Sequence, residues 1–256
     1  MLHWIVHLGA IANFGYAIYW DVYILKLPTQ RSFGGQWKYL TFWNLWIQLI
    51  YFSISLLNSL FGSNAKEKAK ASRLQRLRDY FFSTLAFPIG LFVGIIFWSL
   101  WHIDRELVFP KAFDKFFPNY INHMMHTTVL PAQLLELILL YHIYPSKLKG
   151  MLTTILFCMT YLSWTLVVAH YGGIWVYPIF AVLDPVPRAA FMIFCSMMGA
   201  MLFLGGALFN SVIWGGDSDA SAMKAKDEPL QYSSIHQQQS GGVTTRSKAK
   251  KPKKTD

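Results

Sequence analysis

One threonine and several histidines lie near the ends of apolar stretches of the chain, and together they could perform acyl transfer. A threonine hydroxyl is a weak nucleophile until a base removes its proton, and neutral histidine suits that role near pH 7. When the apolar stretches are laid across a membrane, Thr41 and His126 come to similar depths. This pair therefore predicts a hydroxyl nucleophile with a histidine base.

Both residues belong to stripes of polar side chains at helical spacing. His123 and His126 are three positions apart and share a helix face, which Asn122 and Gln133 extend. A second stripe, on an earlier apolar stretch, consists of Thr41, Asn44, Gln48 and Ser55. Two such stripes are expected to face each other or a wet cavity. Hydrogen bonding between helices, worth about 0.6 kcal/mol per contact, explains the same pattern without any chemistry.

A metal site is a rival interpretation of the same histidines. Four of them are predicted at the same ends of the helices and could converge on a zinc or iron ion: His102, His123, His126 and His170. The sequence has no HExxH motif and no repeated histidine box, and haem ligation between helices is a weaker alternative. Cys158 and Cys195 are too far apart for a metal-binding pair and predict buried thiols without a disulfide. We expect no metal and no cofactor.

The elements that must position these residues are membrane helices. The chain is 54% hydrophobic and only 14% charged, whereas soluble domains carry about 25% charged residues. About 20 apolar residues cross the hydrocarbon as a helix, and six stretches qualify: Trp4–Leu25, Tyr39–Phe61, Tyr80–Trp101, Tyr120–Tyr141, Met151–Tyr171 and Ala189–Trp214. The sequence therefore predicts an all-α, polytopic membrane bundle of about six helices, with kinks at Pro88 and Pro131.

The basic residues predict how this bundle is oriented. Sixteen of the 23 Lys and Arg residues lie in alternate segments, 63–79, 144–150 and 215–256, and the opposite loops hold the other seven. The positive-inside rule places the richer segments, and with them both termini, in the cytosol. Thr41 and His126 then lie toward the lumenal side. A net charge of +10 spread over loops and a tail does not indicate nucleic-acid binding.

The last part of the chain differs from the rest in composition. Residues 1–214 form the predicted transmembrane domain, and 215–256 are rich in Ser, Gln, Gly and Lys, which predicts a disordered, basic, cytosolic tail. Lys253 and Lys254 lie fourth and third from the end. This position predicts a dilysine retrieval signal that coatomer reads. We expect a multi-pass protein of the endoplasmic reticulum, found also at the plasma membrane, with the bilayer as its surroundings.

Several segments, in collinear order over most of residues 30–215, carry a resemblance to a known family. They are Gly34–Phe42, Leu77–Asp79 with Leu85–Pro88, Asp104–Glu106 with Pro110–Lys111, Asn122–Pro131, and Trp175–Pro178. Together they resemble the family of androgen-induced protein 1 and the androgen-dependent TFPI-regulating protein. The resemblance implies an integral membrane threonine hydrolase that acts on fatty acid esters of hydroxy fatty acids. The family's catalytic threonine falls on Thr41 and its catalytic histidine on His126.

Further site residues are expected around this pair. We expect His123 to orient groups in the cavity and Arg105 to bind the carboxylate of the lipid ester substrate. The candidates for donors to the oxyanion are Asn122, Asn44 and Trp37. The alternative function is a non-catalytic membrane regulator or scaffold.

Overall fold

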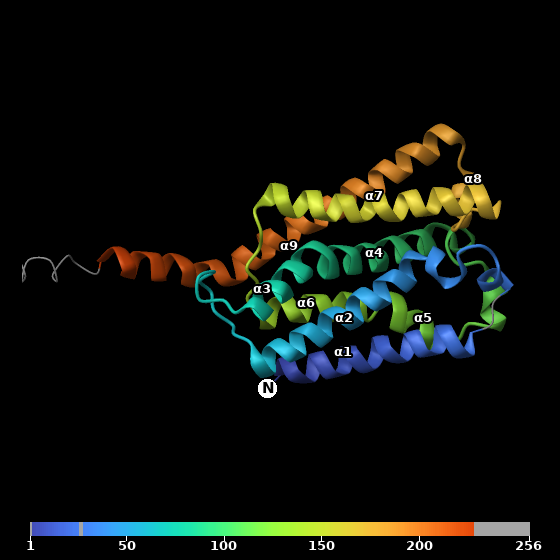
Figure 1. Cartoon of the computed structure of the whole chain (residues 1–256). Helices are drawn as coiled ribbons and strands as arrows, with labels where there is room; N and C mark the ends of the chain where they lie inside the picture. The colour runs from blue at the N-terminus through green and yellow to red at the C-terminus, as the bar shows by residue number, and fades with distance from the viewer. Residues whose placement is uncertain (1, 26–27, 228–256) are drawn as a thin grey trace, which may run out of the picture. The chain divides into compact units, whose positions relative to one another are not determined.

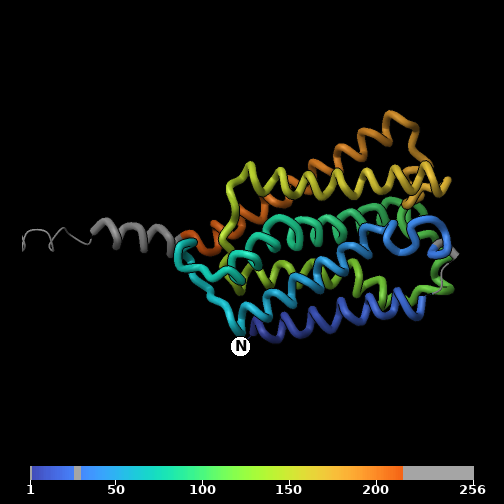
Figure 2. Tube along the Cα trace, viewed as in Figure 1, coloured from blue at the N-terminus to red at the C-terminus, as the bar shows by residue number. Residues whose placement is uncertain are grey.

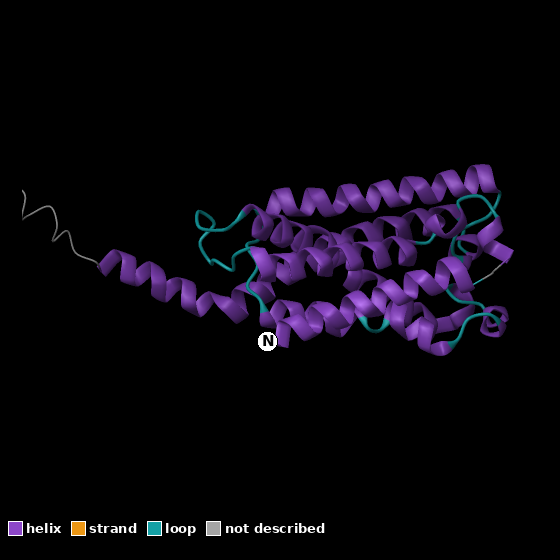
Figure 3. Ribbon diagram, turned by 60° about the horizontal axis from the view of Figure 1, so that its bottom comes forward, coloured by secondary structure: helices purple, strands orange, loops and turns teal. Residues whose placement is uncertain are grey.

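The computed structural model describes residues 2–25 and 28–227, and the regular structure within them is entirely helical (Figures 1 and 3). This confirms the predicted all-α class. The α-helices are α1 Leu2–Tyr19, α2 Leu40–Phe61, α3 Arg73–Phe81, α4 Phe87–Asp104, α5 Asn119–His126, α6 Val129–Leu139, α7 Lys147–Gly172, α8 Pro178–Val182 and α9 Pro185–Asp227. Two π-helical turns, Trp20–Ile24 and Phe82–Ala86, extend α1 and join α3 to α4.

The long helices lie side by side and the chain passes up and down the bundle (Figure 2). Four helical stretches are long and apolar enough to cross a membrane, namely Leu40–Phe61, Arg73–Leu107, Lys147–Gly172 and Pro185–Gly215. The chain is a polytopic membrane protein. The predicted spans over α1 and over α5 with α6 are not among these four stretches, so a count of six crossings, with both termini in the cytosol, stays a prediction.

Two helices present large apolar side chains outward, as a lipid-facing surface requires. On α7 the exposed set is Leu148, Leu152, Leu156, Met159 and Leu166, and on α9 it is Ile193, Phe194, Met197, Met201 and Leu208. Exposed apolar surface of this extent is unusual on a soluble monomer. It agrees with contact between these helices and lipid tails.

The predicted span Tyr120–Tyr141 is not one continuous helix. It breaks into α5 and α6 at Thr127 and Thr128, which lie four and three residues before Pro131. Proline lacks an N–H group and its ring clashes with the carbonyl four residues earlier, here that of Thr127. The N–H of Thr128 instead bonds to the carbonyl of His123 at 3.0 Å. The break leaves His126 at the end of a short helix rather than in the middle of a long one.

The two predicted polar stripes face each other, as the sequence indicated. Thr41 contacts His126, Gln48 accepts a hydrogen bond from Gln133, and the Tyr51 hydroxyl donates to Glu136 at 2.5 Å. Each of the three pairs is separated by 85 positions. Because the offset is constant, α2 and the α5–α6 segment run parallel, and their polar faces form one ladder through the core.

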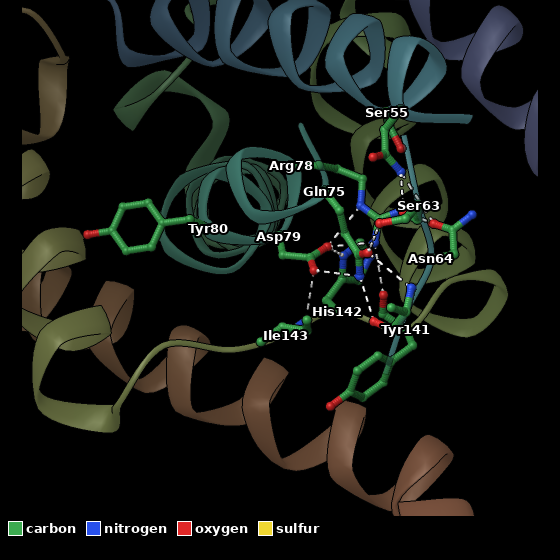
Figure 4. Close-up of polar contacts among 12 residues, drawn as sticks. Ser55, Ser63, Asn64, Gln75, Arg78, Asp79, Tyr80, Tyr141, His142 and Ile143 are labelled. Atoms are coloured by element: carbon green, nitrogen blue, oxygen red, sulfur yellow. Dashed lines mark hydrogen bonds and ion pairs between the residues drawn. The ribbon is translucent and has the colours of Figure 1, made fainter. Parts of the chain in front are cut away.

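A buried charged cluster ties the loops together at the end of the bundle that holds α3 (Figure 4). Arg78, fully buried, donates to the Asp79 carboxylate at 2.6 Å, to Asn64 at 2.6 Å and to the Tyr141 carbonyl at 3.0 Å. His142 also hydrogen-bonds to Asp79, at 3.1 Å. A buried cation without such partners would be strongly destabilising. The cluster joins the α2–α3 connection to the α6–α7 connection.

The chain divides into two units, Met1–Trp214 and Gly215–Asp256. Helix α9 is described as far as Asp227, and the predicted disorder of residues 215–256 stays a prediction. Ala220, Ala222 and Met223 are good helix formers, and extending an existing helix avoids the cost of nucleation. The rest of the predicted tail, with its dilysine at Lys253 and Lys254, lies outside the described residues.

Candidate active site

Thr41 lies in the first turn of α2. Tyr39, with extended backbone at φ −90° and ψ 128°, precedes the helix, and Thr41 is the second helical residue. The turn before it contains Gly34 at φ 85° and Gly35 at φ 52°, conformations that favour glycine. The N-terminus of a helix carries unpaired N–H groups and a partial positive charge. A hydroxyl at this position is therefore close to groups that stabilise negative charge.

His126 is hydrogen-bonded to Thr41 through one ring nitrogen and held by the backbone through the other. Its Nε2 lies 3.0 Å from the Thr41 Oγ1, and its Nδ1 lies 3.1 Å from the carbonyl oxygen of Asn122. A carbonyl only accepts hydrogen bonds, so Nδ1 must carry the proton. Nε2 is then the acceptor and the Thr41 hydroxyl is the donor. This tautomer is the one that a general base requires.

The ring of His126 is also fixed by packing. It stacks on the ring of Phe97, with centroids 3.6 Å apart and 13° between the planes, and only 5% of the residue is exposed. Phe97 belongs to α4, and the same helix approaches the His126 backbone closely at Gly94, where a Cβ would lie 2.8 Å from the His126 carbonyl oxygen. The imidazole therefore has little freedom to rotate away from Thr41.

Two apolar cavities meet at Thr41. The first, about 870 Å³ including its open mouth, extends between α4, α7 and α9, where Phe92, Leu162 and Met192 line it. The second, about 660 Å³ measured in the same way, contains His126, Phe109, Phe113 and Asp21 among its walls. Both cavities are bordered by Thr41, Phe97, Val108 and Tyr177. A ligand whose reactive bond lies at Thr41 would thus have space on both sides.

The two asparagines among the predicted site residues lie beside Thr41 and His126 but outside the two cavities. Asn122 is 4% exposed and supplies its backbone carbonyl to His126. Asn44 is fully buried and its side-chain oxygen accepts from Gln48 at 2.9 Å. Neither side chain lines either cavity. Their roles are in holding the helices and the imidazole, and neither amide reaches the space where a substrate carbonyl would lie.

The other predicted residues are engaged elsewhere. His123 is exposed, stacks on Trp98 and hydrogen-bonds to Thr127 at 2.9 Å. Arg105 pairs with Asp114 at 2.5 Å, and its guanidinium lies 4.3 Å from the ring centroid of Trp101. None of these side chains borders a cavity.

Trp37, also a predicted donor, has its ring exposed, and its carbonyl oxygen accepts from the indoles of Trp43 and Trp164. Its ring lies outside both cavities. The metal alternative lacks a ligand set, because the described parts of the chain contain no group of three or more His, Cys, Asp or Glu side chains that could hold an ion.

Two residues of the site received no role from sequence reasoning. Asp21 lies inside the first predicted span, Trp4–Leu25, and lines the second cavity. An acidic residue inside such a stretch is costly, and that cost is a signal of function. Tyr177 appeared only within the segment Trp175–Pro178, and no spacing rule connects it to Thr41.

Comparison with known proteins agrees with this description. The model of the family described as FAR-17a/AIG1-like protein matches residues 2–211. The androgen-induced gene 1 protein of Homo sapiens is 36% identical over 211 residues, which are 80% of this chain and 88% of that protein. The androgen-dependent TFPI-regulating protein of Rattus norvegicus is 39% identical over 182 residues, 71% of this chain and 79% of the relative.

A membrane protein of Schizosaccharomyces pombe is 24% identical over 203 residues, 78% of this chain and 86% of the relative. No solved structure matches the chain. The family model covers most of the chain and includes every residue that lines the two cavities. The chain therefore belongs to the FAR-17a/AIG1-like family.

Proposed function

We propose that this protein is a threonine hydrolase that cleaves lipid esters, specifically fatty acid esters of hydroxy fatty acids. The observation that carries the proposal is the contact between the Thr41 hydroxyl and the unprotonated Nε2 of His126 at 3.0 Å, in the tautomer that the Asn122 carbonyl selects. A nucleophile and base within hydrogen-bond reach, with the base oriented by a third group, is the arrangement of covalent hydrolases.

The reaction has two halves. The Thr41 oxygen attacks the ester carbonyl carbon while its proton moves to His126 Nε2, and the carbonyl π electrons move onto the oxygen. When this tetrahedral species collapses, the bond to the alkoxy oxygen breaks and that oxygen takes the proton from Nε2. Water then attacks the acyl-threonine, giving a proton to Nε2. The bond from carbon to the Thr41 oxygen breaks, and the Thr41 oxygen recovers the proton.

The two cavities suit a substrate with two apolar arms. In an ester of a hydroxy fatty acid, one alkyl chain extends from the acyl carbon and another carries the alkoxy oxygen. The first cavity, almost wholly apolar in its lining, takes the acyl chain. The second borders Asp21 and Gln30 as well as aromatic rings, and takes the hydroxy acid with its polar carboxyl end. Exclusion of water by both chains strengthens the electrostatic interactions of the transition state.

The test is activity-based labelling of the purified protein with a fluorophosphonate, together with hydrolysis of a fatty acid ester of a hydroxy fatty acid. Wild-type protein is expected to label and to hydrolyse, and Thr41→Ala and His126→Ala to lose both. Thr160→Ala is the matched control, because its hydroxyl is exposed on α7 and bonds only to the Leu156 carbonyl. Hydrolysis by folded Thr41→Ala at the wild-type rate would overturn the proposal.

The same experiment separates the enzyme from a non-catalytic regulator or scaffold. The name of one group of relatives refers to regulation of TFPI. Folded wild-type protein that neither labels nor hydrolyses would favour a regulator.

We place the enzyme in the endoplasmic reticulum, with the plasma membrane as a second location, and propose coatomer as the reader of the C-terminal dilysine. Mutation of Lys253 and Lys254 to serine should then move a tagged protein to the cell surface.

A further inference from the structure

Tyr177 brings its hydroxyl to the start of α2, beside the nucleophile. It lies in the loop between α7 and α8 and accepts a hydrogen bond from the backbone N–H of Leu40 at 2.9 Å. Leu40 is the residue before Thr41, and Tyr177 borders both cavities, as Thr41 does. The hydroxyl is thus close to the place where the carbonyl of a bound ester would lie.

The proton of this hydroxyl is available to a ligand. Tyr161 lies nearby, with its oxygen 2.8 Å from the carbonyl oxygen of Lys38 and 3.3 Å from the oxygen of Tyr177. The Tyr161 hydroxyl is the donor in both contacts, and its single proton lies mainly toward the Lys38 carbonyl, the nearer acceptor. Tyr177 therefore accepts from Tyr161 and from the Leu40 N–H, and neither contact uses the proton of Tyr177. That proton can be donated to an oxygen near Thr41.

Tyr177 is protonated at neutral pH. Burial raises the pKa of Tyr177 to about 12, although hydrogen bonds from Tyr161 and from the backbone N–H groups of Leu40 and Thr41 act to lower it. Those N–H groups belong to the first turn of α2, where the helix dipole favours negative charge. The hydroxyl is therefore a donor, and its surroundings polarise it toward giving up its proton to an anion.

We propose that the Tyr177 hydroxyl stabilises the oxyanion formed when Thr41 attacks the ester; this inference rests on the proposed function. Such donors act in the transition state, where the carbonyl oxygen becomes negative, more than in the ground state. The asparagine candidates Asn44 and Asn122 do not line the cavities, whereas Tyr177 lines both. The substrate carbonyl oxygen would then point toward Tyr177 and the ester's two arms away from it.

The experiment compares Tyr177→Phe with Tyr161→Phe, a matched loss of one hydroxyl from the same cluster. With a fatty acid ester of a hydroxy fatty acid as substrate, Tyr177→Phe should lower kcat on the order of 10²-fold and leave KM within about threefold. Tyr161→Phe removes a long contact in which Tyr177 only accepts, so the Tyr177 proton stays available and kcat should equal that of wild type.

Fluorophosphonate labelling distinguishes loss of the donor from loss of folded protein. The phosphonate adduct also places charge on an oxygen, so Tyr177→Phe should label more slowly yet reach the same final stoichiometry. A variant that had merely lost structure, for example through the Leu40 contact, would instead reach a lower stoichiometry. Should Tyr177→Phe not fold, a kcat of Tyr161→Phe more than tenfold below that of wild type would by itself overturn the assignment.

The remaining outcomes distinguish failure of the Tyr177 assignment from failure of the proposed hydrolase function. Turnover and labelling that depend on Thr41, but that Tyr177→Phe leaves unchanged, would overturn the role of Tyr177 alone. Equal losses in Tyr177→Phe and Tyr161→Phe would do the same, because they would point to a shared structural role. Wild-type protein with no turnover or labelling that depends on Thr41 would overturn the proposed function and this inference with it.

Discussion

The Thr41 hydroxyl and the Nε2 of His126 lie 3.0 Å apart, although 85 positions separate the two residues in the chain. The contact depends on two parallel segments, α2 and α5, that bring a helix start and a helix end together. The ring of His126 is held on one face by Phe97 and at Nδ1 by the Asn122 carbonyl. The imidazole is thus held by three contacts, with the Thr41 hydroxyl, the Phe97 ring and the Asn122 carbonyl. A surface histidine rarely makes all three, and such restraint is typical of a histidine with a chemical role.

Thr41→Val should abolish turnover while the fold persists, because valine keeps the shape of threonine without its hydroxyl. We expect kcat to fall by about 10³-fold or more, as when other hydrolases lose their nucleophile. Thr41→Ser keeps the hydroxyl and should retain kcat within about tenfold. The measurement is ester hydrolysis at saturating substrate, with thermal unfolding in detergent as the check on folding. Equal rates for the valine and serine variants would contradict a nucleophilic role.

Gly94→Ala should displace His126. A Cβ at position 94 would lie 2.8 Å from the His126 backbone oxygen, closer than real contacts allow. Overpacking of this kind costs about 1–3 kcal/mol, and a shift of about 1 Å in a catalytic group costs on the order of 10²-fold in rate. The matched control is Gly205→Ala on α9, where an added Cβ meets nothing within 4 Å.

The measurements are the thermal unfolding temperature and kcat of Gly94→Ala and of Gly205→Ala. Gly94→Ala should unfold at a lower temperature than wild type and lose activity, whereas Gly205→Ala should be as stable as wild type or more stable. A fully active Gly94→Ala protein would show that α4 does not constrain the imidazole.

Helical spacing and span order were sufficient to pair Thr41 with His126, because residues on facing polar stripes must share a depth in the membrane. They were not sufficient for Tyr177, which reaches the site from a loop whose path depends on tertiary packing. Asn44 lies on the predicted stripe but three residues along α2 from Thr41, and its amide bonds to Gln48 rather than facing a cavity. Helical periodicity predicts which residues share a face of a helix, but it does not predict which of them line a cavity.

Arg105 shows a different limit. As a basic residue near the predicted lumenal side it was a reasonable partner for a carboxylate, and it does bind one, that of Asp114. The loop that follows α4 brings this acid nine positions away into contact, which composition cannot reveal. Pro131 predicts a kink in the span over α5 and α6, but it does not predict the position of the interruption, which lies at Thr127 and Thr128.

Glu136→Ala should strongly destabilise the bundle. The carboxylate is fully buried and accepts from Tyr51 at 2.5 Å and Ser55 at 2.7 Å, and it lies 2.9 Å from His7 Nε2. Removing it leaves the Tyr51 hydroxyl without its acceptor and leaves Ser55 and His7 bonded only to each other, and breaking a buried pair costs about 3–5 kcal/mol. Glu67→Ala is the control, since the Glu67 and Lys70 side chains are 64% and 71% exposed.

Titration of both glutamate variants with sodium dodecyl sulfate measures the free energy of unfolding. Loss of the exposed pair should cost less than about 1 kcal/mol. Equal stability of the two variants would mean that the Glu136 network contributes nothing to the fold.

Phe191→Ala and Phe113→Ala should each change the preference for a different arm of the ester. Phe191 lines the first cavity and Phe113 the second, and neither residue borders both. A change of one methylene in an apolar pocket is worth about 1–3 kcal/mol in kcat/KM, so removal of a ring should shift the ratio between longer and shorter chains at least about tenfold. Phe191→Ala should then favour longer or branched acyl chains, and Phe113→Ala bulkier hydroxy acids.

The measurement is kcat/KM for a set of esters in which one arm varies while the other stays constant. Because both variants replace phenylalanine by alanine, they lose the same amount of packing. The expected difference between them is which arm of the ester, the acyl chain or the hydroxy acid, changes in preference. Reversed preferences would exchange the two arms between the cavities without affecting the chemistry at Thr41. If both variants altered tolerance of the same arm, the second arm would have to lie outside the cavities, along the lipid-facing surface of α7 or α9.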